Sequence, residues 1–219
     1  MDFRLFEGEM ELVGALCEAV ALALVERLKT AAEAGLVVSG GKSVRAFLGE
    51  FPRVFVPWTR IYTTLSDERW VAPNSVHSNE HQLRQLFHRG RAAKSIIVGL
   101  KTSGRTPQEG LVKAQCRLHY FPFPAAATVL GFGADGHVAS LFPGGEYRQG
   151  SLVSTHSPDF PRHRISMSMA MLSNTSHLFI LAPTTTKGML IKRFLSGGLD
   201  CPIVNLIRMT NRVTIFSRI

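Results

Sequence analysis

The chain has 219 residues, of which 45% are hydrophobic and 19% are charged. This balance excludes disorder along most of the length, and the length is sufficient for one hydrophobic core. Lysine and arginine outnumber aspartate and glutamate by 25 to 16, so the formal charge is +9. Such a charge favours anionic partners, but it does not choose among nucleic acid, acidic membranes and phosphorylated small molecules.

The amino-terminal half alternates between short apolar segments and longer segments with helical spacing. Residues 9–34 are rich in Ala, Leu and Glu and predict a helix that ends at Gly35. The elements expected after it are strand 36–38, helix 43–51, strand 61–65, helix 75–87, strand 95–100 and helix 106–118. Strands that alternate with helices indicate parallel pairing.

The carboxyl-terminal half continues this alternation. The elements expected there are strands 127–131, 165–169 and 178–182, helix 185–195, and strands 203–207 and 213–216. No repeat, low-complexity tract or long linker divides the sequence. We therefore expect a single α/β domain over residues 1–219, with a mostly parallel sheet flanked by helices.

The cysteines and the apolar segments bear on compartment and membrane contact. Cys17, Cys116 and Cys201 are too scattered for a CxxC motif, and their odd number argues against a disulfide framework. A reducing compartment, the cytoplasm, is therefore expected. The longest uncharged stretch, residues 118–134, contains prolines and glycines, and the amino terminus is acidic. These features predict neither a signal peptide nor a membrane partner.

Three polar segments follow predicted strands, at residues 39–41, 66–69 and 133–137. Ligands bind outside the carboxyl ends of parallel strands, where glycines let backbone N–H groups approach an anion. Ser39-Gly40-Gly41 is compatible with phosphate binding, although the same residues also suit a simple tight turn. His137 lies between a glycine turn and an apolar run, and a neutral imidazole can take a proton from water near pH 7.

The chain resembles the 6-phosphogluconolactonase family in four ordered segments. These are Val38–Gly41, Asp67–Arg69 with Pro73, Ser75 and Asn79 behind it, Leu130–Pro143 and Arg164–Ser166. The resemblance implies a Rossmann-like α/β fold and hydrolysis of 6-phosphoglucono-δ-lactone to 6-phosphogluconate, the second step of the oxidative pentose phosphate pathway. Lys42-Ser43-Val44 departs from the usual Ser-Thr-Pro, and Thr184 stands where a glycine commonly precedes the lysine that Lys187 resembles.

The resemblance also implies roles for individual residues. His137 is the expected general base, Asp135 its orienting partner, and Arg69 the group that stabilises developing negative charge. The residues expected to bind the substrate or its phosphate are Ser39, Gly40, Gly41, Lys42, Asp67, Arg164 and Lys187. The partner is then a small phosphorylated sugar lactone, and the reaction needs neither a metal nor an organic cofactor.

Several alternatives remain open from the sequence. Sugar-phosphate isomerases and deaminases share the Asp-Gly-His segment, but they continue with an Ala-Phe-Asn-Glu-Pro type of run where this chain has Ala139–Pro143. A catalytically silent sugar-phosphate sensor is a further reading. Nucleic-acid binding is a further alternative, because Arg84, Arg89, Arg91 and Lys94 form a basic stretch. No aromatic residues alternate with these charges in the manner of RNA-binding motifs, so we expect no specific nucleic-acid partner. Oligomeric state is not predicted.

Overall fold

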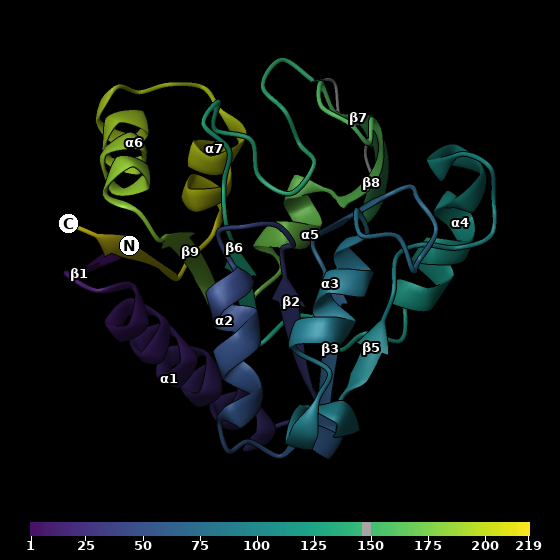
Figure 1. Cartoon of the computed structure of the whole chain (residues 1–219), viewed down its shortest axis with the longest axis horizontal. Helices are drawn as coiled ribbons and strands as arrows, with labels where there is room; N and C mark the ends of the chain where they lie inside the picture. The colour runs from purple at the N-terminus through teal and green to yellow at the C-terminus, as the bar shows by residue number, and fades with distance from the viewer. Residues whose placement is uncertain (146–149) are drawn as a thin grey trace.

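The computed structural model describes residues 1–145 and 150–219, and its main feature is a seven-stranded sheet (Figure 1). Its strands are β1 (Asp2–Phe6), β2 (Ala34–Val38), β3 (Ile61–Leu65), β5 (Ile96–Val98), β6 (Ala127–Leu130), β9 (Leu178–Ala182) and β10 (Val213–Arg218). The spatial order is β1-β10-β9-β6-β2-β3-β5, and every neighbouring pair is parallel. The carboxyl ends of all seven strands therefore meet at one edge, which confirms the predicted α/β class with a mostly parallel sheet.

A second, antiparallel sheet lies beyond that edge. It consists of β4 (Asp67–Arg69), β8 (His163–Met167) and β7 (Leu152–His156), in that spatial order. Only Ser66 separates β3 from β4, and the Ser66 carbonyl accepts a hydrogen bond from the Met167 N–H. The small sheet thereby continues from the large one at the edge where ligands bind in α/β proteins.

Seven α-helices occur in the described part of the chain. They are α1 (Glu9–Leu28), α2 (Arg45–Glu50), α3 (Asn79–Leu86), α4 (Pro107–Leu118), α5 (Met169–Ser173), α6 (Thr185–Ser196) and α7 (Pro202–Met209). α1 contacts α2, and α2 contacts α3, so these three form one layer over the sheet (Figure 1). α6 packs on β9 and β10, whereas α4 packs on the small sheet.

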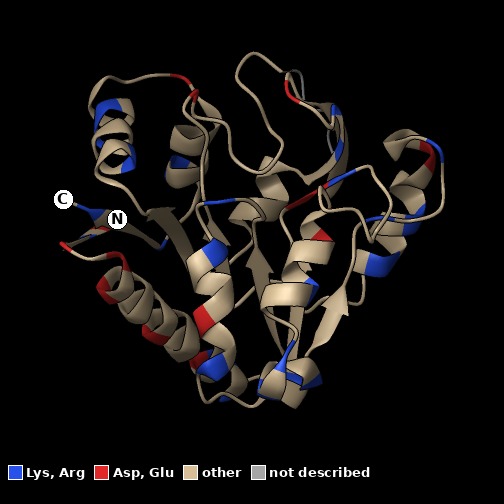
Figure 2. Cartoon of the chain, in the orientation of Figure 1, with Lys and Arg blue, Asp and Glu red and all other residues tan. Residues whose placement is uncertain are grey.

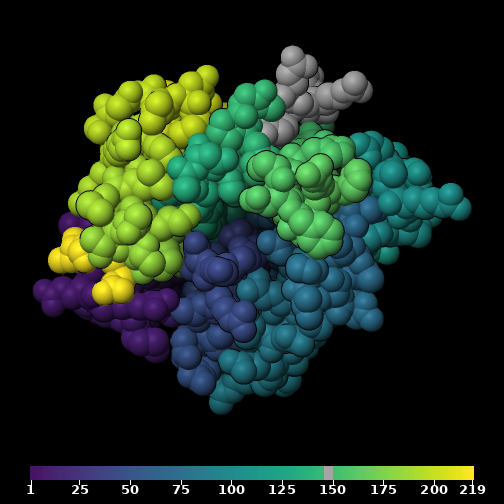
Figure 3. Space-filling model, turned by 45° about the horizontal axis from the view of Figure 1, so that its top comes forward, coloured from purple at the N-terminus to yellow at the C-terminus, as the bar shows by residue number. Residues whose placement is uncertain are grey.

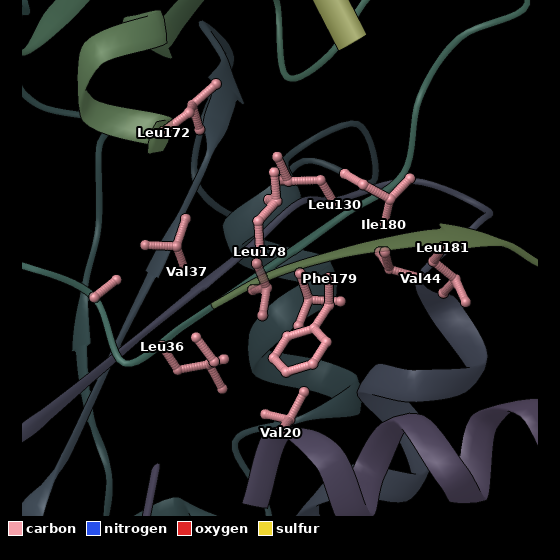
Figure 4. Packing of buried hydrophobic residues seen from close by; sticks show 14 of the residues in the cluster. Val20, Leu36, Val37, Val44, Leu130, Leu172, Leu178, Phe179, Ile180 and Leu181 are labelled. Atoms are coloured by element: carbon pink, nitrogen blue, oxygen red, sulfur yellow. The ribbon is translucent and has the colours of Figure 1, made fainter. Parts of the chain in front are cut away.

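The core forms between α1 and the large sheet. Leu12, Leu16, Val20 and Leu24 recur at helical spacing and are all buried. Figure 4 shows Val20 of α1, Leu36 of β2 and Phe179 of β9 within one cluster. β2 and β9 are buried along their whole lengths, as expected for central strands of a sheet covered on both faces.

Several predicted boundaries differ from the structure. The strands at 61–65 and 178–182 have the predicted bounds, whereas the first helix ends at Leu28 instead of residue 34. Ala34 and Gly35 belong to β2, where they pair with Ile61 and Tyr62. Pairing with a neighbouring strand therefore outweighs the local helical composition of this segment.

The predicted strand at 203–207 is wrong, because these residues lie in α7. Ile203, Leu206 and Ile207 have the i, i+3, i+4 spacing of one helix face and are buried, and Pro202 occupies the first turn. Met169 was assigned to a strand but begins α5, whose cap is the Ser168 hydroxyl. The strands β1, β4 and β7 and the short helix α5 were not predicted.

Candidate functional site

A polar cavity of about 310 Å³ lies between the carboxyl edge of the large sheet and the small sheet. Figure 3 shows this hollow where the segments near residues 40, 135 and 160 meet. Eight of the ten predicted site residues line it: Ser39, Gly40, Gly41, Lys42, Asp67, Arg69, His137 and Arg164. The structure thus brings together residues that lie more than 120 positions apart in the chain.

His137 is held by Asp135, which does not itself line the cavity. The Nδ1 atom of His137 is 2.6 Å from Oδ1 of Asp135, and the backbone N–H of His137 donates to the same oxygen at 3.1 Å. A proton on Nδ1 that is donated to Asp135 leaves Nε2 as the proton acceptor. Gly133 permits this arrangement, because a methyl group at that residue would overlap with the His137 ring. The ring is also packed beside Phe142, at 4.8 Å between centroids.

Arg69 and Arg164 are direct cross-strand partners, because β4 and β8 pair Arg69 with Arg164. Like charges that face each other across a sheet are normally unfavourable, so this pair indicates a place for an anionic ligand. The Arg69 Nη1 donates to the His77 carbonyl, while the buried Nε of Arg69 has no hydrogen-bond partner among the described residues. Arg164 Nε donates to the Pro161 carbonyl.

Carboxylates near these arginines offset part of the positive charge. Burial lowers the pKa of Arg164, while Asp67 opposes that shift and the Arg69 charge adds to it. Asp67 is itself buried and accepts hydrogen bonds from the Ser66 hydroxyl at 3.0 Å and from the Ser140 hydroxyl at 2.6 Å. The bond to Ser140 connects β4 to the loop that carries His137.

That loop contains a left-handed residue at the cavity wall. Ala139 has a φ of +52°, and the backbone groups of Val138 and Leu141 bond to each other across the turn. A non-glycine residue rarely adopts this conformation, and such strain persists only where surrounding contacts impose it. The buried Ser140 hydroxyl and its N–H, which donates to Ser166 Oγ, supply those contacts.

Glu68 lies between the cavity residues Asp67 and Arg69 in the sequence, but its carboxylate is bonded to other groups of the protein. Its buried carboxylate accepts four hydrogen bonds, from the N–H groups of Arg69, Asn79 and Glu80 and from the Ser78 hydroxyl. Burial raises the pKa of Glu68, while these bonds act in the opposite direction. Glu68 thereby joins β4 to the first turn of α3.

The loop after β2, residues 39–43, forms another wall of the cavity. Ser39 Oγ accepts a hydrogen bond from the Gly131 N–H at 3.1 Å, which ties the loop to the end of β6. The Gly41 N–H, predicted as a phosphate donor, instead donates to the side chain of Gln82 at 2.9 Å. Gly40 and Lys42 line the cavity as predicted residues, and Ser43 joins them.

Lys187, a candidate for binding the phosphate, is not among the residues that line the cavity. Its Nζ donates to the Phe132 carbonyl and lies 4.5 Å from the centre of the Phe132 ring. Burial lowers the pKa of Lys187, and the charge of Asp135 opposes that shift. In this structure, Lys187 therefore supports the wall that Phe132 forms.

Several cavity residues were not predicted as site residues. They are Ser43, Asn79, Gly131, Phe132, Ala139, Phe142, Ser157, Asp159 and Phe160. Ser157, Asp159 and Phe160 lie in the connection between β7 and β8, a hairpin that the sequence interpretation missed. Leu152–His156 reads Leu-Val-Ser-Thr-His, with two adjacent apolar residues and no period-two alternation, so the local pattern does not predict a strand there.

The basic stretch of Arg84, Arg89 and Arg91 is engaged in separate contacts within the protein. Arg84 pairs with Glu80, Arg89 donates to the Gly49 carbonyl, and Arg91 lies over the Phe55 ring. Among the described residues, no group of three or more His, Cys, Asp or Glu side chains has an arrangement suited to a metal ion. No helix in the same part of the chain is long and apolar enough to cross a membrane.

Comparisons with known proteins agree with the fold. Residues 7–215 match the family model of glucosamine-6-phosphate isomerases/6-phosphogluconolactonase. A 6-phosphogluconolactonase from Pseudomonas aeruginosa is 36% identical over 166 residues, covering 72% of this chain and 70% of the relative. One from Rhizobium meliloti is 29% identical over 197 residues, covering 90% and 83%.

A solved structure extends this similarity to three dimensions. The crystal structure of a 6-phosphogluconolactonase from Shewanella baltica superimposes with a TM-score of 0.89 at 26% identity, covering 100% of this chain and 97% of that one. The family model spans nearly the whole chain. The chain therefore belongs to the glucosamine-6-phosphate isomerase/6-phosphogluconolactonase family.

Proposed function

We propose that this protein hydrolyses 6-phosphoglucono-δ-lactone to 6-phosphogluconate, as a step of the oxidative pentose phosphate pathway. The observation that carries the proposal is the His137–Asp135 pair beside a cavity that two opposed arginines also line. The names of the related proteins in Pseudomonas aeruginosa and Rhizobium meliloti support the same reaction. We further propose that the whole chain acts as one catalytic domain, because β1 near its start pairs with β10 near its end.

His137 is the general base of the proposed reaction. Asp135 holds the ring through Nδ1, so Nε2 accepts a proton from water as the water oxygen attacks the lactone carbonyl carbon. The side chain is 34% exposed, which leaves the imidazole accessible to water. Attack produces a tetrahedral intermediate in which the former carbonyl oxygen carries negative charge.

Arg69 stabilises that charge, and the intermediate then opens the ring. Arg69 lines the cavity, and the buried Nε of its guanidinium has no hydrogen-bond partner among the described residues. When the bond between the carbonyl carbon and the ring oxygen breaks, the electron pair stays on the ring oxygen. The proton held by His137 passes to that oxygen, so the products are a hydroxyl group and a carboxylic acid that ionises in water.

The phosphate end of the substrate binds to groups around the loop 39–43. We assign this end to the Gly40 N–H, the Ser39 and Lys42 side chains, and Arg164, which all belong to the cavity wall. Asp67 organises the arginines and the Ser140 loop without taking a proton-transfer step. Such anchoring of a remote group orients the carbonyl toward His137.

The isomerase or deaminase alternative requires different chemistry at the reacting carbon. A deaminating isomerase must move protons between neighbouring carbons, and the deaminase-type run supplies an additional carboxylate. In this chain the corresponding segment places Phe142 beside His137 and buries Ser140 against Asp67. These contacts favour the lactonase reading, which needs activated water and stabilisation of an oxyanion.

An assay of two substrates tests the proposal on a single preparation. We expect accelerated loss of freshly prepared 6-phosphoglucono-δ-lactone, after subtraction of spontaneous hydrolysis, and no release of ammonia from glucosamine 6-phosphate. Ammonia release without accelerated lactone loss would contradict the lactonase assignment. Tight binding of phosphorylated sugars without turnover of either substrate would favour a sensor.

The setting of the reaction is also part of the proposal. Cys17, Cys116 and Cys201 are free thiols, which supports a reducing compartment and hence the cytoplasm. The proposed proton transfers use only side chains of the protein, so we expect activity without a metal or organic cofactor. The positive net charge favours the phosphorylated substrate.

A further inference from the structure

The glycine loop of the cavity is bound by one side chain from outside the cavity wall. Gln82 of α3 accepts a hydrogen bond from the Gly41 N–H at 2.9 Å and donates one to the Gly41 carbonyl at 3.3 Å. One side-chain amide thus engages both backbone groups of a residue that lies 41 positions earlier in the sequence. Gln82 is half-buried and is not among the residues that line the cavity.

A second contact fixes the preceding residue of the same loop. A methyl group at Gly40 would overlap with the Asn79 side chain, so the first turn of α3 lies directly against the Gly40 backbone. The Asn79 Nδ2 also donates to the Asp67 carbonyl at 2.9 Å. α3 therefore contacts the glycine loop at two successive residues, one through packing and one through hydrogen bonds.

α3 is itself firmly connected to the catalytic half of the cavity. The Glu68 carboxylate accepts hydrogen bonds from the Ser78 hydroxyl and from the N–H groups of Asn79 and Glu80 at the start of the helix. The residue after Glu68 is Arg69, whose Nη1 bonds to the His77 carbonyl just before α3. The helix thus has a fixed position relative to Arg69, and Gln82 transmits that position to the glycine loop.

We propose that Gln82 is a positioning residue that sets the affinity of the loop 39–43 for the phosphate group of the substrate. The inference rests on the proposed function, in which this loop binds the phosphate end. A loop with two adjacent glycines has many accessible conformations, and ordering it during binding costs free energy. The two bonds from Gln82 impose one conformation before the substrate arrives, which reduces that cost.

The contribution of Gln82 is specific to one end of the substrate. Both hydrogen bonds of its side chain go to Gly41, whereas the groups that act on the lactone carbonyl, His137 and Arg69, are held by Asp135 and by β4. Loss of Gln82 should therefore weaken binding of the phosphate and leave ring opening unchanged. A phosphorylated and an unphosphorylated lactone separate these two effects.

The experiment compares Gln82→Leu with Gln85→Ala, using the full chain. Gln85 lies on the same helix but is exposed, so it is a matched control. For Gln82→Leu we expect KM for 6-phosphoglucono-δ-lactone to rise about tenfold, the effect of one or two lost hydrogen bonds. We expect kcat with this substrate, and kcat/KM with glucono-δ-lactone, to stay within about twofold of wild type. Gln85→Ala should change none of these values.

A binding measurement provides a second readout. Calorimetric titration with 6-phosphogluconate should show about tenfold weaker binding to Gln82→Leu than to wild type, and unchanged binding to Gln85→Ala. Circular dichroism verifies that each variant is folded, and Gln82→Ala replaces Gln82→Leu if the latter does not fold. The titration is independent of turnover, so it still tests the loop if wild type hydrolyses neither lactone, a result that would overturn only the proposed reaction.

Three outcomes would overturn the role of Gln82. An unchanged KM and unchanged binding of 6-phosphogluconate would show that the loop needs no support from α3. A lower KM would show that Gln82 competes with phosphate for the Gly41 N–H. An equal fall in kcat for both lactones would place the effect of Gln82 at the reacting carbonyl.

Discussion

The two edges of the large sheet each carry a cavity of similar volume that is lined in part by lysine and arginine side chains. The one at the carboxyl edge has a volume of about 310 Å³, and the one at the amino edge a volume of about 370 Å³. The second cavity is lined by Phe55, Val56, Trp58, Thr59, Arg91 and Lys94, which precede β3 and β5. Figure 2 shows lysines and arginines at both edges. Volume and charge therefore do not identify the site.

The edges differ in how many chemical groups converge. At the carboxyl edge, loops after β2, β3 and β6 meet the hairpin of the small sheet, so an imidazole, two arginines and two adjacent glycines line one space. At the amino edge, Arg91 lies over the Phe55 ring at 5.4 Å, and the polar side chains in the lining are those of Thr59, Arg91 and Lys94, with no histidine or carboxylate among the described lining residues. A functional site requires several polar groups that converge, and parallel strands supply them at their carboxyl ends.

Two histidines show the same difference. His137 at the carboxyl edge is 34% exposed and bonded to a carboxylate. His177 precedes β9 at the amino edge, where it is buried, stacked on Phe179 and 2.8 Å from the Thr214 hydroxyl. Burial, with a smaller contribution from Arg212 and Arg4, lowers the pKa of His177 to about 4. One imidazole is placed for chemistry, and the other is part of the core.

The largest expected effect tests the carboxyl edge. His137→Ala should lower kcat by about 10²- to 10⁴-fold, because it removes the positioned general base. Steady-state assays with background subtraction measure this loss, and circular dichroism verifies that the variant is folded. Near-wild-type kcat in folded His137→Ala would reject His137 as the base.

The amino-edge histidine should affect stability instead of rate. Unfolded His177 takes up a proton near its ordinary pKa of 6.5, whereas the folded protein does so only near 4. Acidification therefore favours the unfolded state. The stabilisation present above about pH 7 is lost progressively between about pH 6.5 and 4, and it amounts to about 3 kcal/mol in total.

Urea unfolding followed by the fluorescence of Trp58 and Trp70 measures this dependence. His177→Gln retains a polar group toward Thr214 but does not titrate, so its free energy of unfolding should fall less than that of wild type between about pH 7 and pH 5. The expected difference in slope corresponds to about 2 kcal/mol over that interval. Parallel curves for the two proteins would rule out His177 as the titrating group.

A matched pair of arginine variants sharpens the contrast between edges. Arg69→Ala should lower kcat/KM by about 10- to 100-fold, the range expected for a hydrogen bond to a charged group. Arg91→Ala should leave kcat/KM within about twofold, since Arg91 belongs to the amino-edge cavity. The reverse ranking would move the site to the amino edge.

The smallest expected effect concerns metal ions. Prolonged treatment with EDTA, followed by its removal, should leave kcat unchanged if His137 alone activates water. The control is the same treatment followed by addition of a divalent ion. Loss of activity that the ion restores would require water activated by metal.

Much of the site was predictable because its signals are local. The Gly133–His137 segment and the Asp67–Arg69 segment each follow a short strand, β6 or β3, that the sequence pattern predicts. That arrangement predicts that both reach the same edge of a parallel sheet, and eight of ten predicted site residues line one cavity there. Asp135 beside His137 is also a local feature, since the two residues are separated only by Gly136.

The remaining features depend on contacts between distant segments, which local patterns do not contain. The pairing of β4 with β8 sets Arg69 opposite Arg164. The packing of α3 places Gln82 where its side chain accepts a hydrogen bond from the Gly41 N–H. Lys187 donates a hydrogen bond to the Phe132 carbonyl because the fold brings these two distant residues together. Composition and spacing determined the α/β class and the general place of the site, since both follow from local periodicity. Which donors remain open to a ligand was decided only by the tertiary structure, because each N–H or side chain bonds to whatever group the fold brings within reach.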